Sequence, residues 1–317
     1  MSVSFCGLEL AHPIINGSGT FDAIAAGQVF GEQLRERFPF AAYVSKTITL
    51  APRQGNPPPR LWEAPAGLIN SIGLPNKGLD RYLSEDLPAL AQLGIGVSAA
   101  DRPGRGVPLI TNVMGSSAQE ISNLLDACDE HEQIAAIELN VSCPNVKTGL
   151  DIGADPRSLE QVLGAVRGHT RKPLIVKLTP NTADVAACAR AAQDGGADAV
   201  SLINTLRAMA LAPGPRSSEA DGSAQGSGAR WLGGGSGGLS GPAIRSVALA
   251  QVAAVTERVS VPVIGMGGVQ SAAHARDLID VGATLVAVGT ESFRDPEAGW
   301  RIAQGLGWSR QTADSTI

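Results

Sequence analysis

Eight short segments of the chain are apolar on successive residues, and most are separated by stretches with the pattern of a helix. Strands exposed on one face alternate apolar with polar residues, whereas parallel strands buried on both faces are apolar throughout. The segments therefore predict a buried parallel sheet. They begin at Pro13, Ala42, Leu109, Ala136, Leu174, Ala199, Val261 and Leu285, and read PIINGSG, AYVSKT, LITNVMG, AIELNVS, LIVKLT, AVSLINT, VPVIGMGG and LVAVGT.

Residues typical of helix ends lie between these segments. Pro156 follows Asp155 at one expected helix start, because proline is favoured in the first turn of a helix. Thr182 and Ser271 are candidate N-caps of two further helices, since hydroxyl groups accept hydrogen bonds from the first free N–H groups. The other expected boundaries are Gly195-Gly196 after one helix, Gly241-Pro242 before residues 243–259, and Asp295-Pro296 before the last helix.

A strand followed by a helix, eight times in about 300 residues, predicts a (β/α)8 TIM barrel. A doubly wound open sheet is the alternative. We expect residues 1–317 to form one domain with two loop excursions. Residues 50–105 are rich in proline and glycine and are expected over the C-terminal face of the barrel, and residues 206–238 contain a low-complexity surface insertion at 213–228.

Composition excludes several classes of protein. The net charge is -5 and aromatic residues make up 4% of the chain, which argues against nucleic-acid binding. No apolar run has the roughly 20 residues of a membrane helix, and the N-terminus lacks a signal peptide, so we expect a cytoplasmic protein. The four cysteines are far apart, which argues against a disulfide framework, a zinc site and an iron–sulfur cluster.

Amide, ammonium, thiol and glycine groups follow the expected strands, at the end of the barrel where active sites lie. No aspartate, glutamate or histidine is expected at a strand end, which argues against a metal hydrolase or a pair of catalytic carboxylates. The polar residues at these ends are Asn16, Gly17, Ser18, Gly19, Lys46, Thr47, Asn112, Asn140, Cys143, Asn145, Lys177, Asn204, Thr205, Gly267, Gly268, Gly289 and Thr290.

Three features of this set suggest a ligand. Glycines after the last two strands predict a phosphate site, although tight turns would also use them. Lys46 and Lys177 lie within apolar segments, where a lysine is costly unless it meets a negative group or reaches the surface. The recurring asparagines, which elsewhere cap helices and form turns, offer both donors and acceptors and suit a pyrimidine or an isoalloxazine ring.

Eight motifs, in order along residues 3–305, resemble the dihydroorotate dehydrogenase family: SKTIT, NSIGLPN, ELNVSCPNVKTG, VKLTPN, LINT, GGLSGPA, IGMGG and VAVGT. The resemblance implies an FMN-binding (β/α)8 barrel that oxidises (S)-dihydroorotate to orotate in de novo pyrimidine (UMP) biosynthesis. With a cysteine in the loop after Asn140, the chain resembles the soluble class of the family, in which a cysteine is the base. NVKTG and PRQGNPPPR resemble the NAD-linked subtype more than the fumarate-reducing one.

The resemblance also implies roles for individual residues. Cys143 would be the base that removes a proton from C5 of the substrate, and the hydride at C6 would pass to flavin N5. Lys177 would stabilise the negative charge of reduced flavin. The implied substrate-binding residues are Lys46, Asn70, Ser71, Ile72, Gly73, Leu74, Asn140, Asn145, Asn204 and Thr205. The implied FMN-binding residues are Gly17, Ser18, Lys46, Thr47, Asn112, Asn140, Lys177, Gly241, Gly267, Gly268, Gly289 and Thr290, and no metal is expected.

Transfer of electrons to NAD+ would require a partner, because the chain has neither clustered cysteines nor a GxGxxG motif after a strand. The resemblance implies a partner subunit with FAD and a [2Fe–2S] cluster, and a homodimer within a heterotetramer. The alternatives are a fumarate-reducing enzyme, a barrel like dihydropyrimidine dehydrogenase, a cysteine nucleophile as in purine-nucleotide dehydrogenases, and a non-catalytic phosphate-binding barrel.

Overall fold

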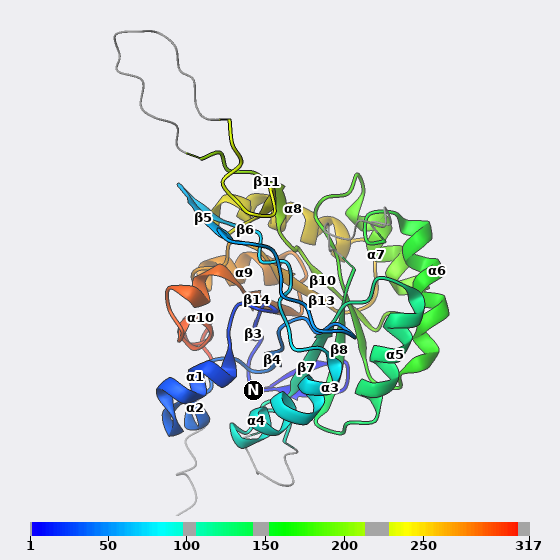
Figure 1. Cartoon of the computed structure of the whole chain (residues 1–317). Coiled ribbons are helices and arrows are strands. Elements are labelled where there is room, and N and C mark those ends of the chain that lie inside the picture. Colours follow the sequence, from blue (N-terminus) through cyan, green and yellow to red (C-terminus); the bar gives the residue numbers. More distant parts are fainter. Residues whose placement is uncertain (1, 98–105, 142–151, 213–227, 310–317) are drawn as a thin grey trace, which may run out of the picture.

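A computed structural model describes residues 2–97, 106–141, 152–212 and 228–309. Its centre is a sheet of eight parallel strands in the order β3-β14-β13-β10-β9-β8-β7-β4, with helices outside it (Figure 1). All eight strands expected from the apolar segments are present, which confirms the TIM barrel. They are β3 (Ile14–Asn16), β4 (Tyr43–Val44), β7 (Leu109–Val113), β8 (Ile134–Asn140), β9 (Leu174–Lys177), β10 (Ala199–Leu202), β13 (Val263–Met266) and β14 (Leu285–Val288).

The outer layer of the barrel is helical. Apolar residues of these helices pack against the outer face of the sheet, including Leu124 of α5, Leu163 of α6 and Val252 of α8. Within the described ranges, no helix is long and apolar enough to span a membrane. The helices are α1 (Ala23–Phe30), α2 (Glu32–Glu36), α3 (Leu79–Arg81), α4 (Leu87–Gln92), α5 (Ala118–Asp129), α6 (Pro156–Val166), α7 (Val185–Asp194), α8 (Arg245–Thr256), α9 (Ala272–Asp280) and α10 (Ala298–Gly305).

The expected helix starts at Asp155 and Ser271 are confirmed, since each side chain accepts a hydrogen bond from a backbone N–H of the first turn. The expected cap at Thr182 is wrong. Asp184 caps α7 by accepting from the Ala187 N–H, whereas the Thr182 hydroxyl donates to the Ala154 carbonyl. A carboxylate two residues further along the chain therefore takes the position given to the hydroxyl.

Two other helix starts lie later than expected. Pro242 begins a 3-10 turn, and α8 begins at Arg245. The last helix, α10, begins at Ala298 rather than directly after Asp295-Pro296. Asp295 accepts instead from the N–H of Glu297, at 2.9 Å. In both places proline opens a turn that precedes the helix.

The two excursions expected as loops contain strands that form one antiparallel sheet, in the order β11-β12-β6-β5. Figure 1 shows it over one end of the barrel. Ser240, the last residue of strand β12, accepts a hydrogen bond from Thr290, which follows β14, so the sheet covers the C-terminal ends of the barrel strands. Residues 79–92 of the first excursion are helical and belong to the outer layer. The strands are β5 (Leu61–Ala64), β6 (Gly67–Asn70), β11 (Leu206–Ala208) and β12 (Gly237–Ser240).

The opposite end of the barrel is closed by a hairpin of β1 (Val3–Phe5) and β2 (Leu8–Leu10). Phe5 and Leu10 of this hairpin are almost completely buried, in a cluster with Ile15, Ile110 and other inward-facing residues of the barrel strands. The interior is thus a packed core at this end, and the chemistry is confined to the other.

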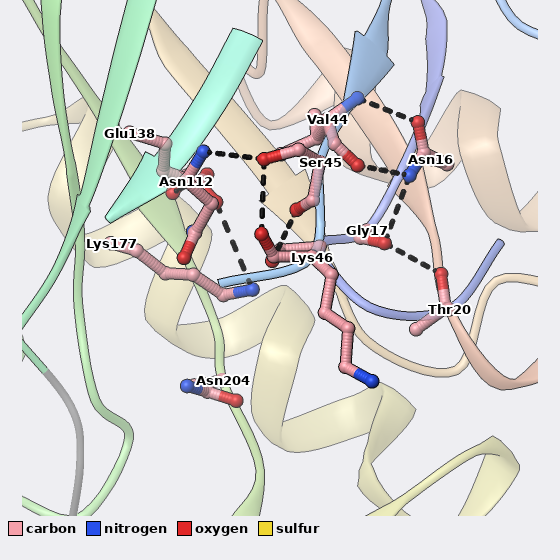
Figure 2. Close-up of polar contacts among 12 residues, drawn as sticks. Asn16, Gly17, Thr20, Val44, Ser45, Lys46, Asn112, Glu138, Lys177 and Asn204 are labelled. Atoms are coloured by element: carbon pink, nitrogen blue, oxygen red, sulfur yellow. Dashed lines mark hydrogen bonds and ion pairs between the residues drawn. The ribbon is translucent and has the colours of Figure 1, made fainter. Parts of the chain in front are cut away.

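A side chain bridges the one gap in the strand order, between β3 and β4. β3 and β4 lie at the two ends of the strand order and share no ladder. The buried Asn16 amide bridges them, because Oδ1 accepts from the Val44 N–H and Nδ2 donates to the Val44 carbonyl, each at 2.8 Å (Figure 2). Asn16, expected among the polar residues at the active-site end of the barrel, therefore has a structural role: its side chain takes the place of backbone hydrogen bonds between β3 and β4.

Replacing Asn16 with alanine is expected to lower the free energy of unfolding by about 2–4 kcal/mol, because the N–H and C=O of Val44 would lose their buried partners. Denaturant unfolding measures this change. Asn123→Ala is a matched control on the exposed face of α5, with an expected change within about 0.5 kcal/mol. Equal unfolding midpoints for Asn16→Ala and the wild type would show that the bridge contributes nothing.

Candidate active site

The expected site residues that the structure describes lie at the C-terminal ends of the barrel strands or in the sheet above them. Cys143 and Asn145 lie outside the described residues. Asn140 ends β8 and is paired in register with Lys177 at the end of β9. Asn204 follows β10, and its side-chain oxygen accepts from the N–H of Thr205 at 2.9 Å.

A cluster of buried polar side chains lies across four neighbouring strands. Asn112 of β7 pairs in register with Glu138 of β8, and Ser201 of β10 pairs with Lys177 of β9. The Glu138 carboxylate accepts from Asn112 Nδ2 at 2.5 Å and from Ser201 Oγ at 2.7 Å. Lys177 Nζ lies 4.0 Å from the same carboxylate (Figure 2). The buried position expected for Lys177 is thus confirmed, with the carboxylate as its negative neighbour.

None of the eight barrel strands ends in an acidic residue, as expected, but Glu138 inside β8 was given no role from the sequence. It lies two residues before Asn140 on β8, so both side chains point to the same face of the strand. The alternation of side chains along a strand therefore places the glutamate of the motif ELN on the same face as Asn140.

The side-chain oxygen of Asn112 has no hydrogen-bond partner although the residue is completely buried. Such orphaned acceptors are rare in folded proteins and point to a missing donor. The Lys177 ammonium, a donor, lies on the same carboxylate. The pair thus offers an acceptor beside a donor, which fits the N3–H and C2=O edge of an isoalloxazine ring.

Lys46 differs from the expectation of a buried lysine, because its side chain is exposed. Figure 2 shows Lys46 in the same region of the structure as Lys177 and Asn204. The backbone beside it is fixed by two serines: Ser18 donates to the Ser45 carbonyl at 2.8 Å, and the Asn112 N–H donates to Ser45 Oγ at 3.0 Å. The loop that contains Gly17 and Ser18 is thereby joined to the ends of β4 and β7.

The segment from Ser71 to Leu74 has an unusual backbone. Gly73 and Leu74 have φ angles of 77° and 56°. The second value is costly for a bulky side chain, and strain of this kind is retained mainly at functional sites. Two asparagines hold the segment: Asn56 donates to both oxygens of Ser71, and Asn76 donates to the Leu74 carbonyl at 3.0 Å. The geometry agrees with a backbone shaped to bind an anion.

Asn70 and Thr205 come from different excursions and are brought together by β12. Gly238 of that strand pairs in register with Asn70, whose Nδ2 donates to the Gly238 carbonyl at 3.2 Å. A methyl group on Gly238 would lie 2.5 Å from Cβ of Thr205. Only glycine therefore allows the three residues to approach this closely. Gly238 belongs to the motif GGLSGPA, in which only Gly241 was expected to bind a ligand.

The expected phosphate-binding residues after β13 and β14 also lie together. A Cβ atom on Gly268 would be 3.0 Å from the Gly241 carbonyl oxygen, and one on Gly241 would be 3.6 Å from the Thr290 methyl group. Both glycines have positive φ angles, 69° and 86°. Their backbones approach one another at the start of the 3-10 turn that precedes α8, near Thr290 after β14, and the start of a helical turn presents N–H groups to an anion.

None of the three cysteines that the structure describes is suited to take up a proton near neutral pH. Burial raises the pKa of Cys6 to about 11 and that of Cys128 to about 12. The pKa of Cys188 is also raised, again by burial. Cys6 moreover lies in the turn between β1 and β2, at the other end of the barrel. No described cysteine is therefore a rival to Cys143 as a base.

Comparisons with known proteins agree with this geometry. The family model described as dihydroorotate dehydrogenase matches residues 1–308. A protein of Pelobacter propionicus, named dihydroorotate dehydrogenase B (NAD(+)), catalytic subunit, is 43% identical over 96% of this chain and 92% of its own length. Proteins of the same name from Geotalea daltonii and Thermoanaerobacter sp. are 40% and 37% identical, with the same shares of both chains.

Proposed function

Because the chain belongs to the dihydroorotate dehydrogenase family, we propose that it oxidises (S)-dihydroorotate to orotate in de novo pyrimidine biosynthesis, as an FMN-dependent catalytic subunit. The observation that carries this proposal is the unpartnered Asn112 oxygen beside the buried Lys177. An unpartnered acceptor beside a donor fits a ligand ring that carries an N–H group next to a carbonyl group.

FMN fits the residues at the strand ends and, when bound, supplies the acceptor for the hydride that leaves C6 of the substrate. Asn112 would accept from the ring N–H, and Lys177 would offset negative charge at the adjacent carbonyl. Glycine backbones at the ends of β13 and β14 would hold the phosphate group. The full proposed set is Gly17, Ser18, Lys46, Thr47, Asn112, Asn140, Lys177, Gly241, Gly267, Gly268, Gly289 and Thr290.

The substrate would lie between the barrel and the antiparallel sheet. The backbone of Ser71 to Leu74, shaped by Asn56 and Asn76, would bind its carboxylate. Amide and hydroxyl groups would hydrogen-bond the pyrimidine ring and orient C5 towards Cys143, which would take the C5 proton as a thiolate. The proposed substrate-binding residues are Lys46, Asn70, Ser71, Ile72, Gly73, Leu74, Asn140, Asn145, Asn204 and Thr205.

We also propose that electrons pass to NAD+ through a second protein. The relatives that share 37–43% identity carry the words catalytic subunit in their names, which supports a partner. The partner would carry FAD and a [2Fe–2S] cluster, and the assembly would be a heterotetramer built on a homodimer of this chain. The cytoplasmic location stays a prediction from the sequence.

An absorbance spectrum before and after anaerobic addition of dihydroorotate tests the reaction. We expect a yellow protein whose flavin band is bleached by dihydroorotate and not by dihydrouracil. Bleaching by dihydrouracil alone would instead indicate a dihydropyrimidine dehydrogenase, and a colourless protein with no affinity for FMN would contradict the proposal altogether.

The electron acceptor requires a separate assay with the purified chain. We expect no reduction of NAD+ by dihydroorotate until a partner with FAD and iron is added. Rapid NAD+ reduction by the chain alone would contradict the need for a partner, and efficient turnover with fumarate would place the enzyme in the fumarate-reducing class.

A further inference from the structure

Glu138 is a carboxylate buried beneath the candidate flavin site, and the proposed reaction gives it no role. Its side chain is 2% exposed, and its neighbours Asn112 and Lys177 are 0% and 5% exposed. A buried carboxylate is expensive unless hydrogen bonds or a positive charge offset the loss of water. Glu138 has hydrogen bonds from Asn112 and Ser201 and the positive charge of Lys177 nearby. These three residues come from three different strands, which shows a site built around the carboxylate.

The hydrogen bond to Asn112 fixes the direction of that amide. An ionised carboxylate only accepts, so Asn112 must turn its NH2 group towards Glu138 and its oxygen away from it. Ser201 occupies the second carboxylate oxygen as a donor. The unpartnered Asn112 oxygen is therefore a consequence of Glu138, and a ligand beside it must present an N–H group.

The contact with Lys177 is electrostatic rather than a hydrogen bond. The distance from Nζ to the carboxylate is 4.0 Å, which is too long for a hydrogen bond but close enough for strong attraction between buried charges. The N–H groups of the Lys177 ammonium can thus donate hydrogen bonds to another acceptor. Its positive charge is offset by Glu138, so a ligand meets a nearly neutral pair rather than an isolated cation.

We propose that Glu138 is a positioning residue for the flavin ring, which orients Asn112 as an acceptor and limits the positive charge that Lys177 presents. This inference rests on the proposed function, because it requires FMN at these strand ends. The positive charge of Lys177 favours the anionic reduced flavin over the neutral oxidised one, and Glu138 weakens that preference. The carboxylate thereby holds down the reduction potential of the bound flavin.

The charge is tested by measuring the midpoint potential of bound FMN in Glu138→Gln, which keeps the shape and removes the charge. The amide can still accept from Asn112 and donate to the Ser201 hydroxyl. We expect the ratio of affinities for reduced and oxidised FMN to rise at least tenfold, which raises the two-electron potential by about 30 mV. An unchanged or lower potential would overturn the proposal.

Three controls separate charge from distortion. Ser201→Ala removes the other hydrogen bond, Glu138→Asp keeps the negative charge, and Glu160→Gln removes an exposed carboxylate from α6. Each should shift the affinity ratio less than threefold, and a shift equal to that of Glu138→Gln in any of them would refute the role of the Glu138 charge. If Glu138→Gln does not fold, Lys177→Gln decides, since it should lower the ratio at least tenfold, and no change would overturn the proposal.

The orientation of Asn112 is tested by binding FMN and N3-methyl-FMN to the apoprotein, with flavin fluorescence as the signal. The wild type should bind the methylated probe at least tenfold more weakly, and Glu138→Gln should keep this preference. Equal affinity of the wild type for the two flavins would overturn the inferred orientation. A wild-type chain that binds no FMN would overturn the proposed function as well, whereas bleaching by dihydroorotate with an unshifted Glu138→Gln potential would overturn this inference alone.

Discussion

Replacing Cys143 with alanine is expected to lower the rate of dihydroorotate oxidation by about 10²- to 10⁴-fold, the usual contribution of a positioned base. The C5 proton is not acidic enough to leave without one. The described cysteines cannot substitute, because burial raises the pKa of each and Cys6 lies at the far end of the barrel. FMN should remain bound, since its proposed contacts come from the strand ends.

Anaerobic stopped-flow measurement of flavin bleaching at saturating dihydroorotate checks this result. Cys6→Ala is the matched control, with a rate expected within twofold of the wild type because Cys6 is remote from the strand ends. A Cys143→Ala protein that is bleached at the wild-type rate would rule out the thiol base. A protein that has lost its flavin would show instead that Cys143 is needed for the cofactor site.

The barrel could be predicted from the sequence because its strands are buried on both faces. A strand such as LIVK in β9 has no exposed side and therefore shows no polar residue until Lys177, where it reaches the site. The same geometry explains why Asn112, Asn140 and Lys177 could be placed at the strand ends: each is polar within an apolar segment. The C-terminal ends of the strands meet on one face of a barrel, so residues at these ends can be placed together without a prediction of the loops between them.

The antiparallel sheet could not be predicted, because its strands carry no local signal. β12 reads GGLS, and glycine is among the residues least favoured in strands. Its conformation is set by pairing with β6 and β11, which are distant in the sequence. The structural role of Asn16 could not be predicted for a related reason, since its partner Val44 becomes its neighbour only when the barrel closes.

Replacing Gly238 with alanine is expected to raise the KM for dihydroorotate by about tenfold to a hundredfold, the usual effect of displacing a contact by about 1 Å. The new methyl group would collide with the Thr205 side chain, lying 2.5 Å from its Cβ, on the residue next to Asn204. Either Thr205 moves, or β12 moves and takes Asn70 with it, because the Asn70 amide donates to the Gly238 carbonyl. Both routes displace proposed contacts to the pyrimidine ring.

Steady-state kinetics and FMN content together decide whether Gly238 acts through the substrate site. All proposed FMN contacts except Gly241 lie on the barrel strands or directly after them, so the Gly238→Ala protein should keep its full complement of FMN and its midpoint potential. Gly164→Ala on α6 is the matched control: nothing lies within 4 Å of its Cβ, and alanine in a helix is expected to raise stability by about 0.5–1 kcal/mol without a change in KM. An unchanged KM in Gly238→Ala would mean that Thr205 and Asn70 do not hold the substrate. Loss of FMN would mean that the sheet supports the cofactor instead, because the strain would then have passed from Ser240 to Thr290 at the proposed phosphate site.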